Sequence, residues 1–375
     1  MKRTLLLLSA AFSSAGWGEA ASNTRLSASI ATIRAVGPEG RGNAEAARAW
    51  KVLGAADAGS LLAVLGGMDG ANDLAVNWLR AAVDAIAGRE LAAGRRLPVD
   101  GLEKFVRDIS HHPRARRLAY ELIAQANPDI ARRLIAGLRD DPATELRRDA
   151  VQLLIDEAAA LGTAARTNDA VAKYQTAILS ARDVDQVEGI ARDLKKFGHP
   201  VALPVVFGWV TRWKVIGPFD STGGIGHEKG YPPEERLDFD AEYDGKTGRV
   251  RWQDIVATGD YGLVDLNKPC GMLKEVAGYA CTEFHTDKAR PVELRLGCQN
   301  AWKIWLNGTL LFGRDEFHRG MEIDQYRMRA ELKPGKNTLL VKICQNEQKE
   351  EWTKGWEFQL RITDALGTPI ASSKP

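Results

Sequence analysis

Hydrophobic positions along the chain follow two different periods, and the change between them falls near Gly198. Over residues 25–198 apolar side chains recur every three to four positions, which is the period of amphipathic helices. Within residues 72–87, for example, this spacing predicts one apolar stripe, made of Leu74, Trp78, Leu79, Val83 and Ile86. From Val205 onward, β-branched and aromatic residues alternate with polar ones, as in half-buried strands. The pattern predicts a helical domain over residues 25–198 and an antiparallel β domain over residues 205–372.

Proline marks the start of three predicted helices. Pro113, Pro128 and Pro142 each stand at a first helical position, where the missing N–H costs no hydrogen bond. Asn127 and Asp141, which precede the second and third, are good capping residues. The predicted helices cover residues 113–126, 128–139, 142–161, 168–181 and 185–197. Their short connections imply antiparallel neighbours.

A helical hairpin recurring at this spacing resembles the HEAT-type α-solenoid, over roughly residues 40–198. Identity between the repeats is weak, so a plain helical bundle remains the alternative. Arginines recur near the helix starts, as in Arg116-Arg117 and Arg147-Arg148, and acidic residues are interleaved with them. They form either a basic stripe for an acidic partner or solvated faces with intrahelical ion pairs. The interleaved acids favour the second interpretation.

The β domain reads as a series of short strands separated by turn residues. The predicted strands cover residues 205–216, 249–253, 275–286, 292–298, 302–306, 337–344 and 356–363. Asn307-Gly308 supplies the positive φ angles that a two-residue hairpin turn requires. The glycine-rich segment 223–230 runs into Pro232 and Pro233, so we interpret it as an ordered surface excursion and not a phosphate loop. These features predict an antiparallel sandwich or jelly roll.

Composition limits the classes of function. The net charge of +2 is the difference between 51 basic and 49 acidic residues, which argues against nucleic acid or an anionic membrane as a partner. The first 20 residues are typical of a secretory signal peptide: Lys2 and Arg3, a short apolar stretch, then Gly18 and Ala20 before a cleavage position. We therefore expect a secreted or periplasmic protein without a membrane-inserted segment.

All four cysteines lie in the β domain, at positions 270, 281, 298 and 344. An exported chain with an even number of cysteines can form disulfides. The strand phase points Cys298 inward and Cys344 outward, which argues against pairing these two. Cys270–Cys281 is the favoured pair, and free buried thiols are an equal alternative. No Cys-x-x-Cys spacing indicates a zinc site, and no motif indicates a cofactor.

Three motifs of the β domain carry a resemblance. They are Asn300–Gly308 (NAWKIWLNG), His318-Arg-Gly320 and Leu332–Lys342 (LKPGKNTLLVK), in this order. Over roughly residues 275–365 the chain resembles the galactose-binding-like sandwich, which recurs as a non-catalytic domain in exported glycoside hydrolases. Trp213–Phe219 resembles the first strand of similar sandwiches. The combination with a HEAT-like half resembles uncharacterised secreted proteins of planctomycete-type bacteria, a resemblance that implies no activity.

Candidate ligand-binding residues come from the loops and the aromatic positions of the β domain. His318 and Asp324 belong to a charged loop that forms either a small polar site or a salt-bridged cap. Strand phase places Trp302 inward and Trp305 outward, where a flat ring can stack on a sugar face. The other candidates follow the predicted strand 337–344: Gln345, Asn346 and Trp352. The tryptophans can equally pack against the helical half.

No catalytic motif is present, since the sequence lacks GxSxG, HExxH and Walker patterns. The sequence therefore predicts a non-catalytic exported binding protein whose sandwich recognises extracellular carbohydrate. The alternative is a scaffold that binds a protein partner through its helical half and has no small-molecule ligand. An enzyme is the third hypothesis, and it rests only on the loop around His318.

Overall fold

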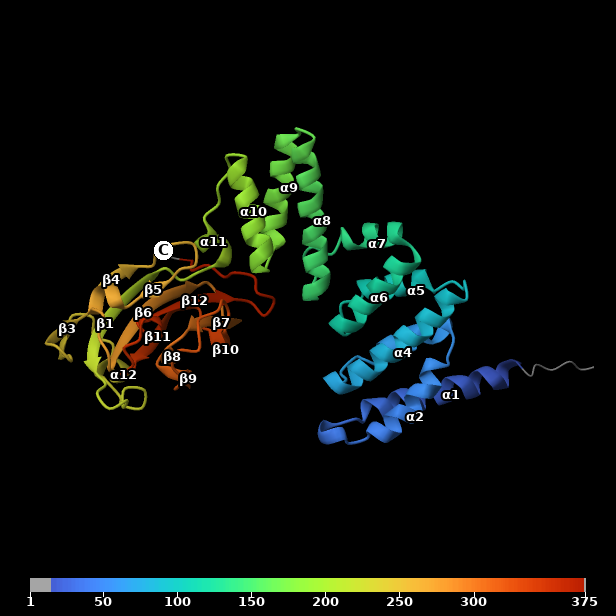
Figure 1. Cartoon of the computed structure of the whole chain (residues 1–375), viewed down its shortest axis with the longest axis horizontal. Coiled ribbons are helices and arrows are strands. Elements are labelled where there is room, and N and C mark those ends of the chain that lie inside the picture. Colours follow the sequence, from blue (N-terminus) through green and yellow to red (C-terminus); the bar gives the residue numbers. More distant parts are fainter. Residues whose placement is uncertain (1–14, 374–375) are drawn as a thin grey trace, which may run out of the picture. The chain divides into compact units, whose positions relative to one another are not determined.

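The computed structural model describes residues 15–373, so most of the predicted signal peptide lies outside the described residues. The chain divides into two compact units, residues 1–157 and 158–375. A helical region precedes antiparallel sheets, and the predicted two-part α and β architecture is confirmed (Figure 1).

The first unit is a succession of helices joined by short turns. Its helices are α1 Ala15–Arg34, α2 Asn43–Gly54, α3 Leu61–Gly66, α4 Asp73–Ala92, α5 Val99–Arg107, α6 Pro113–Ala126 and α7 Pro128–Ile135, followed by α8 Thr144–Thr163, which runs into the second unit. Pro113 and Pro128 open α6 and α7 as predicted, and the Asn127 side chain caps α7 by accepting the N–H of Ile130 at 3.1 Å. Helix α7 ends four residues earlier than the predicted 139 because Ala136 and Gly137 begin a turn.

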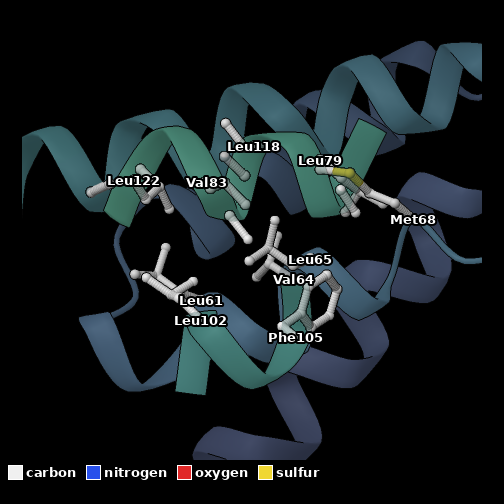
Figure 2. Packing of buried hydrophobic residues seen from close by; sticks show 14 of the residues in the cluster. Leu61, Val64, Leu65, Met68, Leu79, Val83, Leu102, Phe105, Leu118 and Leu122 are labelled. Carbon is white, nitrogen blue, oxygen red and sulfur yellow. The ribbon is translucent and has the colours of Figure 1, made fainter. Parts of the chain in front are cut away.

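Leucine and valine side chains from α3, α4, α5 and α6 form the core of this unit (Figure 2). Leu61, Val64 and Leu65 of α3 meet Leu79 and Val83 of α4 in a fully buried cluster. The prediction that Leu74 belongs to the apolar stripe is wrong, because Leu74 is exposed in the first turn of α4. Burying an aliphatic side chain of this size stabilises a fold by about 1.5–3 kcal/mol, so this cluster is the main source of cohesion.

A buried ion pair ties α6 to the turn before α8. Both side chains are almost completely buried, and the Arg116 guanidinium donates to both carboxylate oxygens of Asp141, at 2.8 and 2.6 Å. Arg116 also donates to the carbonyl of Val106 at 2.8 Å, and Asp141 accepts the N–H of Ala143 at 2.8 Å. One arginine of the recurring series is thus part of the core and is not available to a partner.

The second unit contains two further helices and the β domain. The helices α9 Thr167–Ser180 and α10 Val184–Lys196 match the predicted ranges 168–181 and 185–197 to within a residue or so. They group with the sheets and not with the first unit. Arg182 donates to the Thr368 hydroxyl at 3.4 Å, and the Tyr261 hydroxyl donates to Glu188 of α10. These contacts explain why the compact units divide at residue 157, whereas the hydrophobic period changes near Gly198.

Two antiparallel sheets form the β domain. The six-stranded sheet has the order β4 Gln253–Val256, β1 Arg212–Asp220, β6 Val276–Thr286, β11 Gly335–Gln345, β8 Ala301–Leu306 and β9 Thr309–Arg314. The four-stranded sheet has the order β10 Tyr326–Leu332, β7 Arg290–Cys298, β12 Glu357–Thr363 and β5 Val264–Asp265, and β2 Glu242–Asp244 pairs with β3 Arg249–Arg251 in a separate hairpin. Strands β9 and β10 each form an edge of their sheet, and neither was among the predicted strands.

The inner faces of the two sheets share one core, as in a sandwich. Trp302 and Ile304 of β8 meet Leu294 and Leu296 of β7, and all four are completely buried. The predicted two-residue hairpin turn after β8 is confirmed, because Asn307 and Gly308 have φ angles of +52° and +82° and join β8 to β9. The predicted strand 205–216 is wrong at its start: residues 203–207 form helix α11 (Leu203–Phe207), which opens at a proline and ends at left-handed Gly208.

A second apolar cluster covers the outer face of the six-stranded sheet. Residues 221–252 form an excursion over this face that includes the one-turn helix α12 Pro232–Glu235 and the β2–β3 hairpin. Tyr231, Val250 and Trp252 of the excursion pack on Ile216 and Tyr279 of the sheet. The interpretation of segment 223–230 as an ordered excursion agrees with this arrangement, although one helical turn does form at the two prolines.

A buried lysine fastens the excursion to the sheet. The Lys342 ammonium on β11 is completely buried and donates to the carbonyls of His227 and Lys229, at 3.2 and 2.7 Å, and to Glu234 at 2.8 Å. Its three donors therefore meet three acceptors. The Tyr279 hydroxyl donates to the same Glu234 carboxylate, and burial raises the pKa of Tyr279 far above its usual value.

Candidate functional site

Four of the six predicted site residues meet at one end of the sandwich. His318 belongs to the loop between β9 and β10, while Gln345, Asn346 and Trp352 belong to the end of β11 and the loop that follows it. We call this group the loop cluster: His318, Gln345, Asn346 and Trp352. The two loops are distant in sequence and are joined directly by side-chain contacts.

His318 links the two loops. It adopts a left-handed conformation (φ +58°), and its backbone N–H donates to the carbonyl of Gln299 at 2.6 Å. Its ring Nε2 lies 2.9 Å from Oδ1 of Asn346. That oxygen also accepts the N–H of Gln348 at 3.2 Å, so Nε2 of His318 is the donor in this contact. The other ring nitrogen, Nδ1, is buried and has no hydrogen-bond partner among residues 15–373.

The Trp352 indole is the exposed aromatic surface of the loop cluster. It is 62% exposed and stands edge-on to the His318 ring, with 5.3 Å between ring centroids and an angle of 82°. The turn that carries it is held by Thr353, whose hydroxyl oxygen lies 2.9 and 2.7 Å from the carbonyl oxygens of Gln348 and Glu350 and shares its one hydrogen between them. The ring is therefore presented to solvent from a fixed backbone.

Gln345 is structural and not available to a ligand. It is completely buried, and its amide nitrogen donates to the carbonyls of Thr353 and Gly355 at 2.9 and 3.1 Å. Its amide oxygen accepts from Asn300 and from the backbone of Asn346, at 3.3 and 3.2 Å. Gln345 thus fixes the loop on which Trp352 stands.

A cavity of about 290 Å³ lies next to this loop. Its lining includes three lysines and two apolar residues: Met272, Leu273, Lys274, Lys349 and Lys354. Lys274 donates to the carbonyl and hydroxyl oxygens of Thr353, at 2.8 and 3.1 Å, and partial burial lowers its pKa. Lys274 and Thr353 were not predicted, because no motif or periodicity distinguishes them from ordinary surface residues.

Asp324 lies apart from the loop cluster, in an ionic group on the outer face of the four-stranded sheet. Its carboxylate accepts from Arg361 at 2.5 and 2.7 Å and from Arg295 at 2.7 Å. Burial opposes ionisation of Asp324, but the hydrogen bonds and positive charge of Arg361 and Arg295 outweigh it and lower the pKa. The charged loop is thus a salt-bridged cap at Asp324, and His318 and Asp324 have different partners.

Trp305 has the predicted strand phase but is not exposed. It lies on the opposite face of β8 from Trp302, and the excursion covers that face, leaving the ring 8% exposed. The expectation of an outward ring able to stack on a sugar is therefore wrong, because residues 221–252 supply a second core that the period of β8 does not reveal.

All four cysteines are free buried thiols. Cys298 points into the sandwich core and Cys344 to the opposite side, as predicted. The favoured Cys270–Cys281 bridge is wrong, because Cys270 belongs to the inner core and Cys281 to the outer one. Burial raises the pKa of each thiol to about 12.

Two classes of feature were sought in the described part of the chain. Residues 15–373 contain no group of three or more His, Cys, Asp or Glu side chains placed to hold a metal ion. Among the helices of the same range, none has the length and apolar character needed to cross a membrane.

No protein-family model and no curated protein matches the chain. Similar solved structures include an anti-sigma factor domain-containing protein, with 12% identity, a TM-score of 0.25, and coverage of 44% of this chain and 49% of that one. A β-glucosidase from Kluyveromyces marxianus in complex with glucose shows 13% identity and a TM-score of 0.25, with coverage of 40% of this chain and 16% of that one. The chain thus spans half or less of these proteins, and scores this low carry no argument about fold or function.

Proposed function

We propose that the protein is an exported, non-catalytic binding protein whose sandwich recognises extracellular carbohydrate at the loop cluster. The observation that carries this proposal is the exposed Trp352 ring, held beside the hydrogen-bonded pair of His318 and Asn346. An apolar ring face beside a few fixed polar groups suits a sugar, which presents C–H groups on one face and hydroxyls at its rim.

Three further points support this assignment. The galactose-binding-like resemblance of residues 275–365 is to domains that bind without catalysis. The loop carrying Trp352 is fixed by Gln345 and Thr353, which limits the entropy lost on binding. Export is inferred from the signal-like residues 1–20. The HEAT-like arrangement of the helical region, and the resemblance of the whole combination to planctomycete-type secreted proteins, are parts of the same proposal.

The test is a neutral glycan array followed by titration of the best saccharide by calorimetry. We expect Trp352→Ala to abolish binding and Trp352→Phe to retain part of it. Leu310→Ala is the matched control, since Leu310 is also an exposed apolar residue of the sandwich, at 49% exposure, and lies outside the loop cluster. Absence of saccharide binding at millimolar concentration, or equal binding by Trp352→Ala, would refute the proposal.

A groove in the first unit favours a second function, a scaffold for a protein partner. This groove of about 700 Å³ is lined by the α4–α5 connection and the α6–α7 junction, including Arg95, Arg96, Gln125 and Asn127. Arg95 is paired with Glu90 at 2.6 Å. A pull-down from the exported fraction with Arg96→Glu as the comparison tests it. A partner retained by wild type and lost by this variant supports the scaffold, and recovery of no reproducible partner counts against it.

A further inference from the structure

The open side of the sandwich, between the edge strands β9 and β10, contains a second cavity with a different chemical character. It has a volume of about 440 Å³ and is lined by Leu311, Phe312, Arg314, Gln325, Tyr326, Arg327, Met328 and Arg329. We call it the edge groove. Among these lining residues there are three arginines and no carboxylate.

The positive charge of the edge groove is poorly neutralised. Arg329 has no ion-pair partner among the described residues, and the nearest carboxylate oxygen to Arg327 is 4.0 Å away on Asp324. Asp324 is already engaged by Arg361 and Arg295. The acidic residue opposite Arg329 on β7 is Glu293, and its carboxylate is held by Arg295 at 2.8 Å. Arg314, the third arginine, pairs with Glu316 at 3.6 Å. The groove is therefore lined by two arginines, Arg327 and Arg329, without a close carboxylate partner.

The pairing of β10 with β7 places a further positive side chain next to those of the edge groove. Arg327 lies directly opposite Arg295 in the β10–β7 pairing. Like charges at opposed positions disfavour the pairing of two strands. Glu293 and Asp324 neutralise Arg295, so an anion bound to Arg327 and Arg329 would supply the counter-charge on the β10 side of this pairing.

Aromatic rings form the floor of the edge groove. Phe312 is 47% exposed, and Tyr326 lies partly exposed beside it. Both pack on the completely buried Trp302, with ring centroids 6.0 and 4.9 Å apart. The Arg314 guanidinium lies 5.8 Å from the Phe312 ring centroid. Because Trp302 is anchored in the core, the two rings are held in place before a ligand arrives.

We propose that the edge groove binds a saccharide bearing anionic substituents, either carboxylate or sulfate. Arg327 and Arg329 would donate to the anionic group, since guanidinium geometry matches planar and tetrahedral oxyanions. Phe312 would pack against a sugar ring. The volume falls within the range of small-ligand sites and suits a few sugar units better than an extended acidic peptide. The inference extends the proposed carbohydrate-binding function, but it uses none of the residues of the loop cluster.

The experiment is calorimetric titration of the full chain with tetragalacturonate, a sulfated carrageenan tetrasaccharide, neutral cellotetraose and hexaglutamate. We expect one of the two anionic saccharides to bind, and the one that does identifies the substituent. Binding should weaken with added salt. The double variant Arg327→Gln/Arg329→Gln should lose about tenfold or more in affinity, because charge-assisted hydrogen bonds are removed. Phe312→Ala should also weaken binding.

The matched control is Arg236→Gln/Arg251→Gln, which removes two exposed arginines elsewhere in the second unit, whose nearest carboxylates are 3.7 and 3.9 Å away. It should change affinity less than twofold. An equal loss in the control, no binding of either anionic saccharide, or hexaglutamate binding that is as tight and indifferent to Phe312→Ala would overturn the inference.

The experiments can refute the loop-cluster proposal and the edge-groove proposal independently of each other. Anionic saccharide binding that persists in Trp352→Ala, with no neutral saccharide bound, would refute the loop cluster and support the edge groove. Neutral saccharide binding that persists in Arg327→Gln/Arg329→Gln, with no anionic saccharide bound, would do the reverse.

Discussion

Replacing Lys342 with Met should release the excursion 221–252 from the six-stranded sheet. The ammonium is completely buried and donates to two carbonyls and to Glu234. It also lies 5.1 and 5.7 Å from the ring centroids of Tyr231 and Tyr279. Methionine fills a similar volume but leaves both carbonyls without this donor and leaves Glu234 with only the Tyr279 hydroxyl. The cost therefore comes from lost polar contacts and not from a cavity.

The magnitude follows from the partners that remain. Breaking a buried ion pair by removing one member costs about 3–5 kcal/mol. The Glu234 side chain is 20% exposed, so water can reach part of the stranded carboxylate, and we expect the lower end of this range. A loss of about 3 kcal/mol corresponds to roughly a hundredfold increase in local opening.

Hydrogen exchange measured by mass spectrometry on peptides covering 221–241 is the suitable assay, because it reports local opening within a chain of two units. Lys214→Met is the control. Lys214 lies on β1 of the same sheet and pairs with Asp254 at 2.7 Å, but its side chain is 41% exposed. Its removal should cost no more than about 1 kcal/mol. Glu234→Gln in the Lys342→Met background should restore part of the protection, because no stranded charge remains. Equal exchange in Lys342→Met and Lys214→Met would refute the reasoning.

Three further outcomes follow from the ionic and thiol groups. Because arginine contacts hold the pKa of Asp324 below the usual value of about 3.9, its carboxylate stabilises the fold above that pH and loses this effect as pH falls through the folded-state pKa. Asp324→Asn should cost about 3 kcal/mol at pH 7 by urea unfolding and flatten the acid dependence below pH 4; an unchanged acid dependence would contradict this. Arg116→Lys should destabilise the first unit by about 2–4 kcal/mol in thermal unfolding, because one ammonium cannot satisfy both Asp141 and the Val106 carbonyl, whereas Arg48→Lys, on an exposed pair, should not. Ellman's reagent at pH 8 should titrate no thiol in the native protein and four after denaturation, since burial raises the thiol pKa to about 12; two thiols after denaturation would indicate a disulfide.

The period of the sequence was sufficient to predict which side of a strand each residue faces. Trp302 and Cys298 are inward and Trp305 and Cys344 are on the other side, as the alternation requires. Alternation cannot indicate whether an outward face is covered, since the cover comes from a segment distant in sequence. The error at Trp305 and the mistaken Cys270–Cys281 pair have this common cause. Strand β10, Tyr326–Leu332, does alternate, so the same pattern could have predicted it.

The loop cluster was predictable in its members but not in its roles. The sequence indicated His318, Gln345, Asn346 and Trp352 as candidates because they lie in loops or directly after a strand and have polar or aromatic side chains. The structure brings these four residues together. The separation of a buried, fully bonded Gln345 from an exposed Trp352 depends on the path of the loop, which short-range patterns do not specify. The role of Asp324 could not be predicted for the same reason, because the two arginines that bind it lie on strands far from it in sequence.

Burial on three faces limits where the sandwich can bind a ligand. The inner faces of the sheets close on each other, and the excursion closes the outer face of the six-stranded sheet. On the four-stranded sheet, the outward residues of β12 are buried as well, where Arg361 lies near the rings of Phe207 and Trp209. Among the described residues, the two most exposed aromatic rings lie where these covers end, Trp352 at the loop cluster and Phe312 at the edge groove. Fixed, exposed rings at these two places add little to the stability of the fold, and ligand binding gives them a role.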